Sequence, residues 1–267
     1  MLTASRALRR NIKAGEPLPR VEGLRDLYAM GFAPRRGNVI MVAGRSGSGK
    51  SALAQWWTAQ LSRHGLSVLY FSADMSPFTA SARLASMATG HTLEEVEQGM
   101  EANPEYFTAA ADEYPIRFAF DNPLTLEGIE QELLVDVALN NRYPDIIVID
   151  NLVDFEGGES DYQAQMSIMQ YVTELSRITG ATVLILHHAT DKTDASVRTP
   201  PSRRDIKSGL SEKPELTLTV AVDPDRDLLN IAVVKQRMGP ADPTGTKFAS
   251  LKADLAHSRL MALGSPA

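Results

Sequence analysis

The segment GRSGSGKS, residues 44 to 51, is the feature that most restricts how this chain can fold. It matches the pattern Gly-x-x-x-x-Gly-Lys-Ser/Thr and stands between an apolar run at 39–43 and a helical pattern at 51–63. Glycines in this pattern let the backbone turn its N–H groups around a phosphate, and the helix start adds a favourable dipole. This setting favours a nucleotide site over a chance glycine-rich turn. The predicted phosphate-binding residues are Gly44, Arg45, Ser46, Gly47, Ser48, Gly49, Lys50 and Ser51.

Short apolar runs alternate with helical patterns along the rest of the chain, as strands buried on both faces do. The runs lie at 39–43, 68–71, 116–120, 146–149, 182–186, 216–222 and 229–234, and the clearest helical patterns at 51–63, 126–140 and 163–179. The alternation predicts an α/β fold, with a mostly parallel twisted sheet and helices on both faces. The turn-rich stretch 223–227 predicts an antiparallel hairpin at the sheet edge.

Length and composition indicate one globular domain preceded by a leader. The chain has 267 residues, of which 43% are hydrophobic, and no apolar run is long enough to cross a bilayer. Basic residues interrupt every candidate secretory signal in the first 17 residues, and there are no cysteines. We therefore expect a cytoplasmic protein with a basic leader at 1–34, carrying a short helix around Leu8 and Ile12 on a flexible arm, and a domain at 35–267.

Charge is segregated along the chain, whose net charge is −6. Residues 1–36 hold eight Arg or Lys against three acids, whereas residues 91–136 hold twelve acids against Arg117 alone. The acidic stretch is typical of solvated helices. Any contact with nucleic acid must then come from local basic patches.

Two oxygen-bearing side chains predict a Mg²⁺ site beside the phosphates. In this pattern Lys50 neutralises the outer phosphates of ATP, and the Ser51 hydroxyl binds Mg²⁺. The apolar run at 146–149 ends in Asp150, at the strand end where parallel sheets present side chains to ligands. A carboxylate there can hold the hydrated ion whose other ligand is Ser51, the alternative being a helix cap or a loop acid.

Asp74 is a candidate for orienting the attacking water. It follows the run VLYF in the segment SADMS, and it would lie near the phosphates if the strands are neighbours. A carboxylate in line with the leaving phosphate needs only correct placement to accept a hydrogen bond from water. Capping of the next helix is the alternative.

His187 and His188 end another apolar run, in ATVLILHHAT. Consecutive strand residues point to opposite faces, and no other ligand stands at zinc spacing, so the pair does not indicate a metal site. We expect His187 to sense the γ-phosphate and relay its presence to a loop, with a structural histidine as the alternative. His188 is expected to be structural.

Together these residues resemble the RecA-like ATPase domain of DnaB-type hexameric replicative helicases, and also RepA-type plasmid helicases, over about residues 21–250. YFSADMS is similar to the DnaB strand that carries the catalytic acid, with Asp74 where the family has glutamate. The family's sensor position corresponds to His187, which is glutamine in DnaB, and HHATDK is similar to the plasmid-helicase form. The resemblance implies a RecA-like P-loop NTPase core.

Two further segments extend the resemblance. SRRDIKSGL resembles the family's central DNA-binding loop, one residue shorter, which implies nucleic-acid contacts from Arg203, Arg204 and Lys207. VVKQRMGP is similar to the family's Lys-x-Arg finger, which implies that Lys235 and Arg237 reach the γ-phosphate held by a neighbouring subunit.

The sequence therefore predicts a Mg-ATP-dependent helicase or translocase on single-stranded or forked DNA, assembled as a homo-oligomer, and the resemblance implies a hexameric ring. The leader would dock on an adjacent subunit, as the linker helix does in this family, the alternative being a disordered leader. Two alternatives stay open: a RecA-like DNA-binding ATPase without unwinding activity, and a metal-dependent DNA nuclease, for which no nuclease motif is present.

Overall fold

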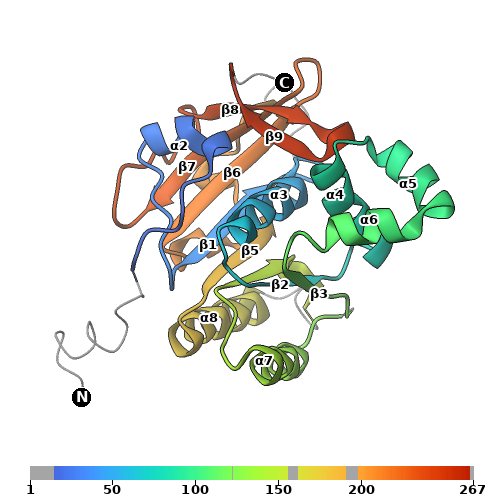
Figure 1. The fold of residues 1–267 in the computed structure, drawn as a ribbon. Helices are drawn as coiled ribbons and strands as arrows, with labels where there is room; N and C mark the ends of the chain where they lie inside the picture. The colour runs from blue at the N-terminus through green and yellow to red at the C-terminus, as the bar shows by residue number, and fades with distance from the viewer. Residues whose placement is uncertain (1–14, 122, 156–161, 191–197, 265–267) are drawn as a thin grey trace.

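The computed structural model describes residues 15–121, 123–155, 162–190 and 198–264, and its strands form one sheet (Figure 1). The strand order is β3-β2-β4-β5-β1-β6-β7-β8-β9. Pairing is parallel from β3 through β6 and antiparallel from β6 through β9. The strands are β1 (Val39–Gly44), β2 (Val68–Ser72), β3 (Ile116–Ala119), β4 (Ile146–Asp150), β5 (Thr182–His188), β6 (Leu216–Asp223), β7 (Leu228–Gln236), β8 (Ala249–Asp254) and β9 (Arg259–Ala262).

Helices connect the parallel strands and cover both faces of the sheet. The α-helices are α2 (Arg25–Ala29), α3 (Lys50–Arg63), α4 (Pro77–Thr89), α5 (Leu93–Ala102), α6 (Pro104–Ala111), α7 (Leu126–Asn140) and α8 (Tyr162–Thr179). Short 3-10 helices are η1 (Glu22–Leu24), η2 (Leu152–Asp154), η4 (Arg203–Asp205), η5 (Lys207–Glu212) and η6 (Leu255–His257). In Figure 1, α3 and α4 lie on one side of the sheet and α7 and α8 on the other.

The core has two halves, one on each face of the sheet, because side chains alternate along a strand. On β1, Ile40 and Val42 join the cluster that contains the buried residues of α3 and α4. Met41 and Ala43 join the second cluster, with the buried residues of α7 and α8. Burial on both faces fixes the register of β1, since a slip of one residue would exchange the two sets.

The predicted alternation of strands and helices agrees with this architecture. The helix expected at 126–140 is α7, and the hairpin expected around 223–227 is formed by β6 and β7. Two further strands, β8 and β9, pair beyond the hairpin and extend the antiparallel part of the sheet. Sequence analysis missed these strands because their alternating burial leaves only a weak apolar pattern.

The described part of the leader packs on the domain. Leu18, Val21, Leu24, Leu27 and Phe32 are buried in the same cluster as α3. Phe32 lies against Trp57 of α3, with ring centroids 5.6 Å apart. The helix expected around residues 8–12 lies outside the described residues, and its docking on another subunit stays a prediction.

The acidic stretch lies mainly on exposed helix faces. Thr92 and Glu95 form a capping box at the start of α5, where negative charge also suits the helix dipole. Arg117 donates to Asp136 at 3.1 Å and pairs with Glu132, so two of the acids hold the basic residue of this stretch. Among the described residues, no helix has the length and apolar character needed to span a membrane.

Candidate functional site

The phosphate loop connects the end of β1 to the start of α3, as the sequence predicts. Gly49, at the N-cap of α3, has a φ of 86°, a left-handed conformation that favours glycine. Gly44 must also be glycine, because an added Cβ would lie 2.3 Å from Ser48 Oγ and 2.9 Å from the carbonyl oxygen of Val220. The loop can therefore bring its backbone N–H groups around an anion.

Lys50 is buried at this loop rather than extended into solvent. Its Nζ donates to the carbonyl oxygens of Gly44, at 3.2 Å, and Arg45, at 2.9 Å. These bonds hold a positive charge at the mouth of the loop, where it can neutralise phosphate oxygens.

Asp150 is the centre of a hydrogen-bonded group at the neighbouring strand end. Its Oδ1 accepts from Ser51 Oγ at 3.2 Å, and its Oδ2 accepts from the Tyr70 hydroxyl at 2.9 Å. Burial raises the pKa of Asp150, although the two hydrogen bonds and the charge of Lys50 oppose this shift; the charge of Asp74 reinforces it. Tyr70 was not expected from the sequence; its signal was a polar atom within an otherwise apolar strand.

The oxygen atoms of Ser51 and Asp150 suit Mg²⁺, which prefers hard oxygen ligands. The described residues hold no cluster of three or more His, Cys, Asp or Glu able to bind a metal. A site with one carboxylate and one hydroxyl fits an ion whose remaining ligands are water and substrate phosphate. Ser51 and Asp150 would hold that ion, and its charge would stabilise negative charge on phosphate oxygens.

Asp74 is exposed and follows β2 by two residues. Strands β2 and β4 are parallel, with Ser72 opposite Asp150, so Asp74 and Asp150 emerge at the same sheet edge. The N-cap of α4 is Ser76, whose Oγ accepts from the backbone N–H of Thr79 at 3.1 Å. Helix capping therefore does not account for Asp74.

His187 lies beside the phosphate loop and is fully buried. It pairs with Ala43 in the parallel β1–β5 register. Its Nε2 lies 3.1 Å from the carbonyl oxygen of Lys207, which only accepts, so Nε2 carries the proton. Burial lowers the pKa of His187 to about 4, and this ring is neutral at pH 7. His188 is half-buried.

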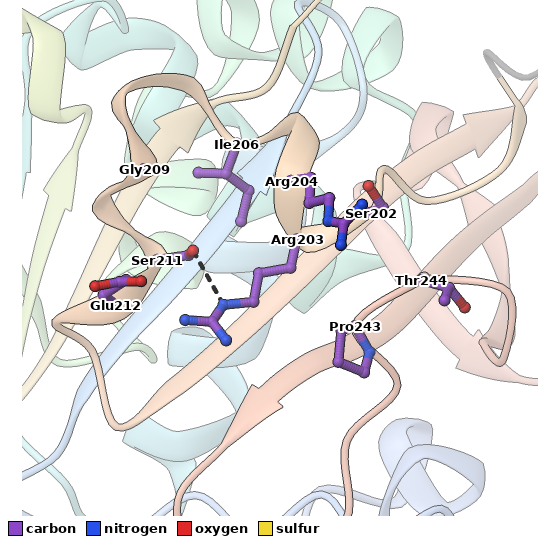
Figure 2. Close-up of a pocket in the computed structure, with 9 residues that line it drawn as sticks. All are labelled: Ser202, Arg203, Arg204, Ile206, Gly209, Ser211, Glu212, Pro243 and Thr244. Atoms are coloured by element: carbon purple, nitrogen blue, oxygen red, sulfur yellow. Dashed lines mark hydrogen bonds between the residues drawn. The ribbon is translucent and has the colours of Figure 1, made fainter.

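The connection between β5 and β6 carries the basic segment. Arg204 and Lys207 are exposed, whereas Arg203 is half-buried and donates from Nε to Ser211 Oγ at 3.2 Å. Figure 2 shows a cleft lined by this segment and by Pro243 and Thr244, and its volume is about 710 Å³.

Lys235 and Arg237 lie at the opposite edge of the sheet from the phosphate loop. Strand β7 is antiparallel to β6, so its end at Gln236 pairs with the start of β6 at Leu216. The backbone N–H of Arg237 donates to Glu215, whose own N–H donates to Val39 at the start of β1. At about 3.3 Å per residue, Val39 at the start of β1 lies roughly 16 Å along the strand from Gly44 at its end. The structure thus brings together Lys50, Ser51, Asp74, Asp150 and His187, but not Lys235 and Arg237.

A second cleft of about 400 Å³ adjoins the phosphate loop between α3, α4 and the C-terminal strands. Its polar side chains include Gln55 and Arg83, with Arg83 Nη1 3.5 Å from Gln55 Oε1. Apolar residues from α4, α5, η6 and β9 complete the wall: Met87, Leu93, Leu255 and Leu260. None of these residues stands in a motif, and only the packing of distant segments brings them together.

Comparison with known proteins places this geometry in a family. Residues 7–194 match the family described as AAA domain. The Gene 65 protein of Mycobacterium phage L5 is 35% identical over 261 residues, which cover 94% of this chain and 95% of that protein. The Gene 65 protein of Mycobacterium phage D29 is 33% identical over 223 residues, covering 80% and 94% respectively.

Solved structures share the fold. A DnaB-like replicative helicase, described with its interactions with primase, matches with a TM-score of 0.78 at 16% identity. The match covers 96% of this chain and 64% of the helicase chain. A separately solved ATPase domain matches with a TM-score of 0.76 at 15% identity, covering 96% of this chain and 94% of that domain. The expected RecA-like ATPase fold of the DnaB type is confirmed.

The burial of neutral His187 predicts a specific loss of stability in acid. Its pKa is about 4 in the folded chain and about 6.5 when unfolded. The unfolded chain therefore gains a proton between these values, while the folded chain does not. We expect the free energy of unfolding to fall by about 3 kcal/mol from this residue between pH 7 and pH 4, with no contribution above pH 7.

Urea denaturation of the parent and of His187→Gln, at intervals from pH 7 to pH 4, measures this contribution. Glutamine keeps a donor for the Lys207 carbonyl but does not titrate. The stability difference between the two proteins should shift in favour of the variant as pH falls. Parallel curves for the two proteins would contradict a buried neutral ring.

Proposed function

The chain belongs to the AAA domain family of ATPases, and on this basis we propose that it is a Mg-ATP-dependent motor acting on single-stranded or forked DNA. The observation that carries the proposal is the convergence of Lys50, Ser51 and Asp150 at one sheet edge. The fold shared with DnaB-like helicase ATPase domains supports the assignment to this kind of motor.

In the proposed hydrolysis, the position of each side chain around the phosphate loop determines its role. Lys50 neutralises the outer phosphates, while Tyr70 holds the Asp150 carboxylate in the orientation in which it faces Ser51. Asp74, exposed at the same edge, orients water in line with the γ-phosphate. His187 reports the γ-phosphate to the β5–β6 connection through its bond to Lys207.

We propose that the active site is completed by a second copy of the chain. Lys235 and Arg237 lie at the far edge of the sheet from their own phosphate loop, which supports action on ATP held by a neighbour. A head-to-tail contact of this kind repeats from subunit to subunit, and it closes into a ring when the rotation allows. A hexamer is the assembly we propose.

DNA is proposed to lie along the β5–β6 connection, where Arg204 and Lys207 face solvent. The segment is linked to His187, so the state of the nucleotide can change its position. Aromatic residues are absent from 198–213, which favours contacts to phosphates rather than stacking on bases.

Lys50→Ala and Asp150→Asn should each lower ATP hydrolysis by at least on the order of 100-fold, because each removes charge that faces the phosphates or Mg²⁺. Lys50→Ala should also weaken binding of a fluorescent ATP analogue. Asp150→Asn should bind the analogue equally with and without Mg²⁺. Phosphate release and binding titrations measure these effects, and parent-level hydrolysis by either folded variant would refute the assignment.

A forked duplex with a labelled strand separates the proposed motor from the alternatives. The parent should displace the strand when ATP is added, and Lys50→Ala should not. Hydrolysis without displacement would instead identify a DNA-binding ATPase that does not unwind. Shortened strands would identify a nuclease.

Removing Arg204 and Lys207, two of the exposed cations of the β5–β6 connection, should weaken DNA binding. The double variant Arg204→Ala, Lys207→Ala is expected to bind single-stranded DNA on the order of tenfold more weakly, with a shallower dependence on salt. Arg142→Ala, Arg177→Ala removes the same charge from exposed positions after α7 and on α8. Equal affinities and salt slopes for the two double variants would exclude this DNA site.

The shared active site predicts rescue when two inactive subunits are mixed. Arg237→Ala should lower hydrolysis on the order of a thousandfold by removing transition-state stabilisation. A randomly mixed 1:1 ring of Arg237→Ala and Lys50→Ala subunits contains intact residues at about one quarter of its interfaces. ATPase activity should therefore reappear in the mixture, and its absence from verified mixed assemblies would rule out the shared site.

A further inference from the structure

Three cationic side chains are fixed by three consecutive residues at the end of the β5–β6 connection. The pairs are Arg203 Nε with the Ser211 hydroxyl at 3.2 Å, Lys235 Nζ with the Glu212 carbonyl oxygen, and Arg237 Nη2 with the Lys213 carbonyl oxygen at 3.3 Å. Because the three acceptors follow one another in the chain, the three cations lie along one short stretch of backbone. Arg203 thus joins the two residues of the finger.

The acceptors of these three cations are all neutral. Within the described ranges, no carboxylate oxygen lies within 4.0 Å of a charged nitrogen of Arg203, Lys235 or Arg237. Other arginines do have carboxylate partners, such as Arg36 with Asp145 and Arg198 with Asp225. The positive charge of the three-cation set is therefore uncompensated by a direct ion pair, which favours binding of an anion.

Lys235 responds to this concentration of positive charge. Its pKa is lowered to about 8, first by desolvation and then by the charges of Arg237 and Arg203, against the opposing charges of Glu215 and Glu212. Arg203 is therefore close enough to disfavour the charged form of Lys235. An anion bound among the three cations would favour the charged form of Lys235. The charged Lys235 would in turn bind the anion more tightly.

Arg203 and its sequence neighbour Arg204 both line the cleft of Figure 2, but their side chains point to different parts of it. Figure 2 shows the Arg203 side chain directed toward Ser211, on the side of Glu212, and the Arg204 side chain directed toward Ser202. The backbone N–H of Arg203 donates to the Pro243 carbonyl oxygen at 2.9 Å, which ties it to the segment that follows β7. Arg203 is half-buried, whereas Arg204 is exposed. A contact with a solvent-borne DNA backbone suits Arg204 better than Arg203.

We infer that Arg203 is a third cation of the finger, and that it contacts the triphosphate of a nucleoside triphosphate held by a second copy of this chain. The inference rests on the proposed shared active site. It reassigns Arg203 from the DNA-binding segment to the catalytic set with Lys235 and Arg237. Its guanidinium would stabilise charge on the phosphate oxygens as water attacks the γ-phosphorus and the bond from that phosphorus to the leaving nucleoside diphosphate breaks.

The test is a mixed-assembly ATPase assay with the full-length chain. Arg203→Ala alone should lower kcat for ATP at least on the order of tenfold in the absence of DNA, with little change in KM, because a transition-state contact is lost. Mixed 1:1 with Lys50→Ala subunits, it should regain activity above the sum of the separate proteins. Arg203→Lys keeps the charge and should retain part of the activity, while Arg177→Ala, on α8, should match the parent.

The other outcomes distinguish among the DNA site, the shared active site and the proposed function. Parent-level kcat for Arg203→Ala without DNA, together with weaker binding to single-stranded DNA, would return Arg203 to the DNA site. Rescue with Arg237→Ala but not with Arg203→Ala would overturn the inference and leave the shared site intact. No rescue with either variant would remove the shared site, and no hydrolysis by the parent would remove the proposed function.

If Arg203→Ala lowers the melting temperature, Ser211→Ala provides the second measurement. It leaves the cation in place and removes only the hydroxyl that orients it. A fall in kcat that is rescued by Lys50→Ala subunits supports the inference. The inference is overturned if a stably folded Ser211→Ala has the parent's kcat and if Arg203→Lys subunits regain no activity when mixed with Lys50→Ala subunits.

Discussion

The parallel pairing of β1 with β5 and β6 is the interaction on which the candidate site depends. It brings Ala43 and Gly44 level with His187 and His188, so the phosphate loop and the sensor candidate leave the sheet at one edge. Packing on both faces makes this register costly to change, because a slip of one residue would exchange the side chains between the two halves of the core. The sheet thus brings polar residues that are far apart in sequence together at one edge.

The reversal of chain direction at β7 separates Lys235 and Arg237 from the phosphate loop. The chain returns along β6 and delivers these residues to the edge far from the phosphate loop. One domain therefore carries two chemically complementary ends, an anion-binding loop and a group of cations. Because the two groups lie too far apart to meet within one copy, a head-to-tail contact between two copies can bring them together.

The β5–β6 connection joins these two ends. It receives the His187 hydrogen bond at Lys207 and holds the three cations from Ser211 to Lys213. Between these points Ser208 has a φ of 59°, a left-handed conformation that is unfavourable for a residue with a Cβ. A segment attached at both ends, with strain between them, can respond at one end to a displacement at the other.

The sequence by itself determined the phosphate loop, the positions of strands β1 to β7 along the chain, and the identity of Asp150 and Asp74 as acids at strand ends. These features are local, since they follow from a motif of eight residues and from the period of apolar side chains. Only the tertiary structure decided that Tyr70 holds Asp150, that Ser76 rather than Asp74 caps α4, and that β8 and β9 extend the sheet. It also separated Arg203 from Arg204, two neighbours that a sequence pattern treats alike. Which side chains meet depends on strand order and on backbone direction at each turn, and these are set by packing between distant segments that no local pattern records.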